Sequence, residues 1–234
     1  REKFFDKETF TVKGNCQTAT GAMLYFGLYE PDEYAPLVKK LISQIEERDW
    51  HLDFGVLGNK FVMQSLGAAG EGNVGQRMIA QRTFPGCQRW IDLGATTLWE
   101  CWNGTGSHNH HMFSDLSAFM YKYIGGISPD ENEPGFAHTI LRPAIDCGME
   151  SASAEHESMY GTVKCYWANR GGDVTLNIKV PVGCHATIYL PRKYARRLYS
   201  DGAPAEKQFR FLETEKEYSI ELESGEYSFS ADMK

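Results

Sequence analysis

The chain has 234 residues, 42% hydrophobic and 24% charged, a composition typical of a globular protein with a sizeable core. Its formal net charge of −7 argues against non-specific nucleic-acid binding, which requires a basic surface. No apolar run approaches the roughly 20 residues that a membrane-spanning helix needs, so we expect neither a nucleic acid nor a membrane as a partner.

The first half of the chain carries helical patterns. Apolar side chains recur at helical spacing, and glycine or proline closes most of these segments, which predicts five helices at 17–28, 37–45, 57–69, 74–81 and 112–124. Helices joined by short loops favour antiparallel pairs, as in a bundle or an α/α barrel. We therefore predict a helical domain over residues 1–130.

The apolar pattern changes its period after Gly125. A polar segment rich in proline and glycine at 127–135 has a composition typical of a linker between domains. Beyond it, apolar and polar residues alternate in short runs, which predicts strands at 137–141, 161–167, 174–180, 186–190, 218–222 and 227–229. We predict an antiparallel β-sandwich over residues 131–234.

The stretch 94–113 contains the residues whose side chains are best suited to catalysis or ligand binding. Glu100 lies between Trp99 and Trp102, and three of the seven histidines follow a glycine-rich connector at 103–106. A carboxylate beside flat aromatic faces suits a sugar site, where rings stack on the sugar and the acid moves protons. In an extended segment Glu100 and Trp102 share a face while Trp99 packs inward. Alternatively, both tryptophans are core residues and Glu100 is a helix-end or salt-bridging carboxylate.

The histidines and cysteines do not form recognisable metal motifs. The spacing of His108, His110 and His111 does not place three imidazoles on one helical face, and no H-E-x-x-H accompanies them. The six cysteines stand singly without a C-x-x-C pair, which favours free thiols over a disulfide framework. We predict no metal and no cofactor, and the compartment stays open.

Aromatic and histidine side chains also occur in the second half. Tyr160, His156 and Trp167 form either a carbohydrate-binding face or cross-strand pairs that stabilise a sheet.

Together these residues resemble the bacterial α-L-rhamnosidase family of glycoside hydrolases. Gly94-Ala-Thr-Thr-Leu-Trp-Glu100 is similar to the family's Gly-Ala-Thr-Thr-[Ile/Leu]-Trp-Glu signature, and Asn109-His110-His111-Met112-Phe113 resembles its Asn-His-Tyr-x-Phe segment. The resemblance implies a six-hairpin (α/α) barrel followed by a β-sandwich. It also implies inverting hydrolysis of terminal α-L-rhamnosides, with Glu100 as general base and His110 reaching the rhamnose. Trp102 and Trp99 are then expected to border the sugar.

The chain departs from this family pattern in three ways. Five helices are too few for the barrel, no counterpart of the family's acidic general-acid segment precedes Glu100, and the connector 101–108 is short. The first residues also lack an initiator Met and a signal-peptide pattern. We expect the C-terminal part of a longer hydrolase, whose partners are a rhamnose-containing oligosaccharide or glycoside and the missing N-terminal part of the same polypeptide. We expect this part alone to be inactive. The alternative is a non-catalytic carbohydrate-binding or structural module.

Overall fold

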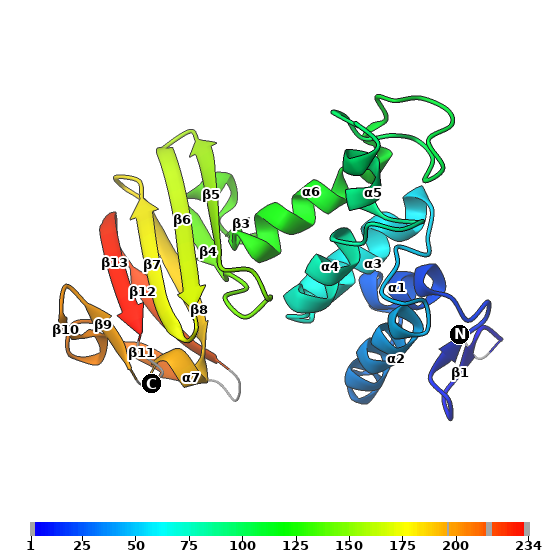
Figure 1. The fold of residues 1–234 in the computed structure, drawn as a ribbon. Helices are drawn as coiled ribbons and strands as arrows, with labels where there is room; N and C mark the ends of the chain where they lie inside the picture. The colour runs from blue at the N-terminus through cyan, green and yellow to red at the C-terminus, as the bar shows by residue number, and fades with distance from the viewer. Residues whose placement is uncertain (1–2, 196, 214–216, 232–234) are drawn as a thin grey trace. The chain divides into compact units, whose positions relative to one another are not determined.

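The structure is a computed structural model that describes residues 3–195, 197–213 and 217–231. The chain divides into two compact units, the helical unit Arg1–Met120 and the sandwich unit Tyr121–Lys234 (Figure 1). None of the described helices is long and apolar enough to cross a bilayer. Helices followed by two large sheets confirm the predicted fold class, while the domain bounds 1–130 and 131–234 stay predictions.

The helical unit begins with a small hairpin and continues with six described α-helices. The hairpin strands are β1 (Phe5–Asp6) and β2 (Thr11–Val12). The helices are α1 (Gln17–Tyr25), α2 (Tyr34–Glu46), α3 (Val56–Ala68), α4 (Gly72–Ile79), α5 (Cys87–Asp92) and α6 (Asp115–Phe119). Two 3₁₀ turns, η1 (Pro31–Glu33) and η2 (His111–Phe113), precede α2 and α6, and the π-helical turn η3 (Met120–Ile124) follows α6. Helix α1 packs against α2 and α3, and α3 also contacts α4 and α6.

Helix α2 illustrates how the sequence builds this unit. The chain enters through Pro31 and a reciprocal capping box between Glu30 and Glu33, which satisfies backbone donors at the helix start. Along the helix, Leu37 and Leu41 are fully buried, as the helical spacing predicts. The apolar stripe therefore forms the core-facing side of the helix.

Glycine allows α1 and α3 to approach closely. A Cβ at Gly21 would lie 2.8 Å from the Val62 side chain, and the Ser65 hydroxyl donates a hydrogen bond of 3.2 Å to the Gly21 carbonyl. A Cβ at Gly58 would lie 2.3 Å from the hydroxyl of Thr18. A side chain at either glycine would therefore clash with its neighbours, so glycine permits this close packing.

The sandwich unit contains a six-stranded and a five-stranded sheet. The first has the order β10-β9-β13-β7-β6-β5 and the second β11-β12-β8-β4-β3. The strands are β3 (Ile127–Pro129), β4 (His138–Leu141), β5 (Ser151–Ser158), β6 (Gly161–Arg170), β7 (Asp173–Val180), β8 (His185–Pro191), β9 (Leu198–Ser200), β10 (Ala203–Pro204), β11 (Phe211–Glu213), β12 (Glu217–Leu222) and β13 (Gly225–Ala231). Three short helical turns, η4 (Pro134–Phe136), α7 (Arg192–Ala195) and η5 (Ala205–Lys207), connect them.

The core of the sandwich unit follows the period-two pattern. Val163, Cys165 and Trp167 of β6 are fully buried, and the Trp167 indole donates a hydrogen bond of 2.8 Å to the Ile124 carbonyl. Because Trp167 is buried, it does not lie on an exposed carbohydrate-binding face with Tyr160 and His156. All six cysteines, each within the described residues, are free, as predicted.

Two sequence predictions for the sandwich unit need correction. Strands β4 and β8 pair in parallel rather than antiparallel, with His138 opposite His185. The polar linker predicted at 127–135 begins with β3, which pairs antiparallel with β4 and contributes the buried Ile127. The sequence pattern did not predict this short strand because the residues that follow it are polar.

Candidate active site

A long loop between α5 and η2 carries the residues that the sequence singles out. Two backbone hydrogen bonds fold it back on itself: the His110 N–H donates to the Leu98 carbonyl at 2.8 Å, and the Glu100 N–H donates to the Ser107 carbonyl at 2.9 Å. The glycine-rich connector 103–106 turns the chain, and the Gly104 N–H donates to the Cys101 carbonyl at 3.0 Å. The loop therefore brings the Glu100 motif beside the His110 motif.

Glu100 is held by the backbone of its own loop. Its Oε2 accepts a hydrogen bond of 2.8 Å from the Ser107 N–H, and its side chain is 43% exposed. Gly106 lies against the carboxylate at φ +82°, and a Cβ there would stand 2.7 Å from Oε2. Glu100 lies on a loop, so the helix-end alternative is wrong. The carboxylate is oriented and accessible to water.

His110 is the imidazole that faces Glu100. Its Nδ1 lies 3.9 Å from Glu100 Oε2, and its side chain is 31% exposed. This separation exceeds that of a direct hydrogen bond by about 1 Å. The His111 ring lies parallel to that of His110, with 6.1 Å between centroids. The structure thus brings Glu100 and His110 together, and their roles stay predictions.

A cluster of aromatic side chains forms the base of the loop. The Trp102 ring stacks on the buried Trp90 at 4.4 Å and contacts Phe113 at 4.4 Å, while its Nε1 donates to the Phe54 carbonyl at 2.7 Å. Trp99, 9% exposed, lies 6.2 Å from Trp90. Both predicted sugar neighbours pack within this cluster, where Trp99 is buried and Trp102 is half-buried. Their contact with a sugar stays a prediction.

His108 completes this scaffold. Its ring stacks on Trp99 at 4.3 Å with an interplanar angle of 12°, and its Nε2 lies 2.9 Å from the Gly104 carbonyl oxygen. A Cβ at Gly104 would meet the Trp99 ring at 3.0 Å. Sequence reasoning missed the contributions of Ser107 and Gly106, although the paired glycines of the connector are a signal for a tightly folded backbone.

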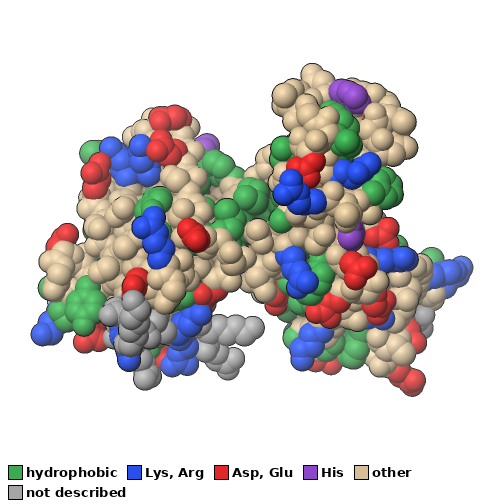
Figure 2. Space-filling model, viewed as in Figure 1, with side chains coloured by type: hydrophobic (Ala, Val, Ile, Leu, Met, Phe, Trp, Pro, Cys, Tyr) green, Lys and Arg blue, Asp and Glu red, His purple; other side chains and the backbone are tan. Residues whose placement is uncertain are grey.

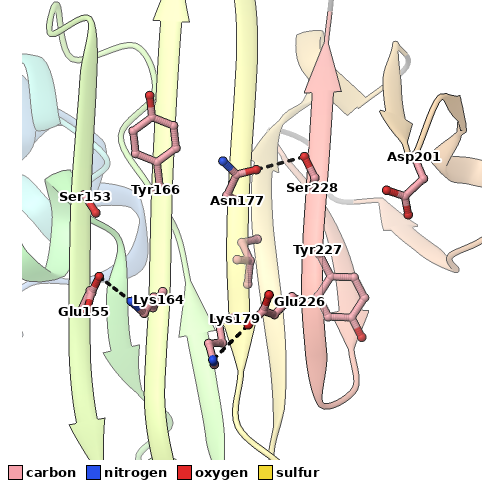
Figure 3. Close-up of a pocket in the computed structure, with 11 residues that line it drawn as sticks. Ser153, Glu155, Lys164, Tyr166, Asn177, Lys179, Asp201, Glu226, Tyr227 and Ser228 are labelled. Atoms are coloured by element: carbon pink, nitrogen blue, oxygen red, sulfur yellow. Dashed lines mark hydrogen bonds and ion pairs between the residues drawn. The ribbon is translucent and has the colours of Figure 1, made fainter.

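A second feature lies on the exposed face of the six-stranded sheet. A groove with a volume of about 510 Å³ lies there, and a row of four residues from β5, β6, β7 and β13 crosses it (Figure 3). The row runs Ser153, Tyr166, Asn177 and Ser228, each opposite the next in the strand register. The Ser228 hydroxyl donates to the Asn177 side-chain oxygen at 3.0 Å. The sequence did not single out these residues.

The neighbouring row of the same groove is charged but internally paired. Lys164 lies 2.8 Å from Glu155, and Lys179 lies 3.0 Å from Glu226. Acidic and basic side chains are also interspersed over the visible face of this unit (Figure 2). The groove therefore favours a neutral ligand over a strongly charged one.

Two family models match the chain. The bacterial alpha-L-rhamnosidase 6 hairpin glycosidase domain matches residues 1–124, and the bacterial alpha-L-rhamnosidase C-terminal domain matches residues 126–202. Among curated relatives, an alpha-L-rhamnosidase of Streptomyces avermitilis is 31% identical over 198 residues, which cover 80% of this chain and 19% of the relative. An alpha-L-rhamnosidase of an Alteromonas species is 28% identical over 207 residues, or 83% of this chain and 22% of the relative.

Solved structures show the same similarity. The alpha-L-rhamnosidase from Dictyoglumus thermophilum superposes with a TM-score of 0.87 and 30% identity, over 99% of this chain and 27% of that one. The Streptomyces avermitilis alpha-L-rhamnosidase complexed with L-rhamnose also gives a TM-score of 0.87, with 28% identity over 99% of this chain and 23% of that one. The chain thus spans about a quarter or less of the relatives that it matches.

Proposed function

The chain belongs to the bacterial α-L-rhamnosidase family, and from this premise we propose that it is the C-terminal part of an enzyme that hydrolyses terminal α-L-rhamnosides. The observation that carries the proposal is the Glu100 carboxylate, oriented by the Ser107 N–H and 3.9 Å from His110. The partners are a rhamnose-containing oligosaccharide or glycoside and the upstream part of the same polypeptide.

In the proposed mechanism Glu100 is the general base of an inverting hydrolysis. An inverting site needs two carboxyl groups about 6.5–9.5 Å apart, with a water between the base and the anomeric carbon. Because Oε2 accepts the Ser107 N–H, Oε1 remains to accept a proton from that water. The general acid that protonates the leaving oxygen comes from the upstream segment.

His110 and the two tryptophans have supporting roles in this proposal. His110 donates a hydrogen bond to a rhamnose hydroxyl, and its partial exposure leaves that proton accessible. Trp102 and Trp99 border the sugar with the edges that the aromatic cluster leaves uncovered. Their packing also fixes the loop that carries Glu100, so the base is positioned by a rigid platform.

The stereochemistry of the product tests the proposed reaction. The polypeptide that contains this chain and its upstream segment is mixed with an aryl α-L-rhamnoside, and proton NMR follows the first sugar released. We expect β-L-rhamnose before mutarotation. Initial release of α-L-rhamnose would contradict inversion, and no release would contradict the proposed activity. The 234-residue chain alone should show no turnover, because it lacks the proposed acid.

The groove of Figure 3 favours a second candidate function, binding of a neutral oligosaccharide by the sandwich unit. Tyr166 offers an aromatic face, Asn177 and Ser228 offer hydrogen-bonding groups, and the charged row is already paired. Titration of the chain with a neutral oligosaccharide, followed by amide NMR, tests it. Shifts confined to β5, β6, β7 and β13 that disappear in Tyr166→Ala support binding, and unchanged spectra contradict it.

A further inference from the structure

Two histidines of the sandwich unit lie directly opposite each other on the parallel strands β4 and β8, and a glutamate reaches them from the segment before η4. We propose that Glu133, His138 and His185 bind a zinc ion that fastens the segment 130–136 to this sheet. The proposal concerns the sandwich unit alone and does not depend on the proposed hydrolase activity.

The three side chains already converge. One potential ligand atom of each lies within 4.8 Å of the other two, and His185 Nε2 is 3.6 Å from Glu133 Oε1. The rings of His138 and His185 stack with 4.4 Å between centroids, because their Cα atoms are register partners. Ligand atoms of tetrahedral zinc lie about 3.3 Å apart, given Zn–N distances of about 2.0–2.1 Å. Binding therefore requires side-chain tilts rather than backbone movement.

Asp130 sets the proton position on His138. Its Oδ2 lies 2.8 Å from His138 Nδ1, and its Oδ1 accepts a hydrogen bond of 2.8 Å from the Asn132 backbone N–H. An ionised carboxylate only accepts hydrogen bonds, so Nδ1 carries the proton and Nε2 keeps the lone pair. A histidine oriented by a carboxylate in this way is the common outer shell of protein metal sites.

In the structure, one hydroxyl group is hydrogen-bonded to the lone pair of His138 Nε2. Thr187 Oγ1 lies 2.8 Å from His138 Nε2 and donates to it, given the proton on Nδ1. Zinc binding replaces this hydrogen bond with a coordinate bond, and the hydroxyl rotates away. Thr187 is therefore a competitor of the ion, which provides a variant that should strengthen binding.

The donor set selects the class of ion. Two imidazoles and one carboxylate suit zinc, whereas calcium takes six to eight oxygen ligands. Glu131 adds negative charge close to Asp130 and Glu133 and favours a cation electrostatically. The fourth zinc position is taken by water, because Glu133 and His185 are each about half exposed.

Calorimetric titration of the chelator-treated 234-residue chain with zinc tests the proposal. We expect one equivalent bound, a raised Tm of the sandwich unit, and the visible absorption of a tetrahedral site when cobalt replaces zinc. His185→Ala should abolish this binding. Asp130→Asn should weaken it about 10–100-fold, in line with loss of an outer-shell partner. Thr187→Val should leave it equal or tighter.

A histidine of the helical unit provides the control. His51 lies outside the sandwich unit, where its ring nitrogens contact the Arg48 carbonyl and the Thr83 hydroxyl. His51→Ala should keep the zinc affinity of the unchanged chain. The proposal is overturned if the chain binds no zinc, or if His51→Ala and His185→Ala reduce the affinity equally.

Discussion

Replacing Gly106 with alanine is expected to disable the proposed base while leaving the fold intact. Gly106 has φ +82°, and a left-handed conformation costs an L-residue about 1–2 kcal/mol. The new Cβ would lie 2.7 Å from Glu100 Oε2 and 3.1 Å from its Cδ, so the carboxylate must move. That movement weakens the 2.8 Å hydrogen bond from the Ser107 N–H.

The expected loss of activity follows from this displacement. A misplacement of about 1 Å at a reacting group costs up to about 100-fold in rate, which corresponds to about 2.7 kcal/mol in the activation free energy. We therefore expect kcat of Gly106→Ala to fall about 10- to 100-fold, with a smaller change in KM. The assay measures hydrolysis of an aryl α-L-rhamnoside by the polypeptide that includes the upstream segment.

Gly70→Ala is the matched control for backbone strain. Gly70 has φ +80°, but a Cβ there meets nothing within 4 Å. Both variants should lose similar stability in urea unfolding, about 1–2 kcal/mol each, because they share the left-handed conformation. Only Gly106→Ala should lose kcat. Equal kcat in the two variants would refute the role of the Gly106 contact in positioning Glu100.

Three further outcomes concern stability and pH. Trp90→Ala should destabilise the helical unit by about 3–5 kcal/mol in urea unfolding, since the buried ring supports Trp102, and a loss under 1 kcal/mol would contradict this. Burial raises the pKa of the Cys165 thiol to about 12, so above about pH 8.5 this thiol ionises only in the unfolded chain. Its contribution should lower the free energy of unfolding by about 1.4 kcal/mol per pH unit in that range. The Cys165→Ala variant should lose that slope, and an unchanged slope would contradict it. Because the pKa of Asp130 is lowered in the folded state, its ionisation should stabilise the fold above about pH 3.9. This stabilisation should be lost as the pH falls through the folded-state pKa. In an acid titration of the free energy of unfolding, Asp130→Asn should lack this contribution.

Elements with a strong local period were predictable from the sequence. The predicted helix at 57–69 is α3, and the predicted strand at 174–180 is β7, because each buries one face and repeats its pattern along its length. Helix α5 was missed because it has six residues between Gly86 and Gly94, too few for a periodic signal. Strand β5 was missed because serine, alanine and charged residues replace the usual β-branched ones, and only Ala154 is buried.

The site geometry depends on contacts that no local pattern encodes. The motif around Glu100 was recognisable, but the Ser107 N–H that orients it comes from the return arm of an irregular loop. The pairing of His138 with His185 depends on a parallel strand pair between residues 47 positions apart in the sequence, which periodicity does not report. In both sites the local sequence pattern identifies the residue types, but the pairing of distant segments determines which side chains meet.

Glu100→Gln tests the central claim most directly. The substitution keeps the size of the side chain and removes its ability to accept a proton, and Glu46→Gln on the exposed face of α2 is the control. With the upstream segment present, we predict that kcat of Glu100→Gln on an aryl α-L-rhamnoside falls at least about 1,000-fold, while Glu46→Gln keeps full turnover. Turnover by Glu100→Gln within tenfold of the unchanged enzyme would contradict the assignment of Glu100 as the general base.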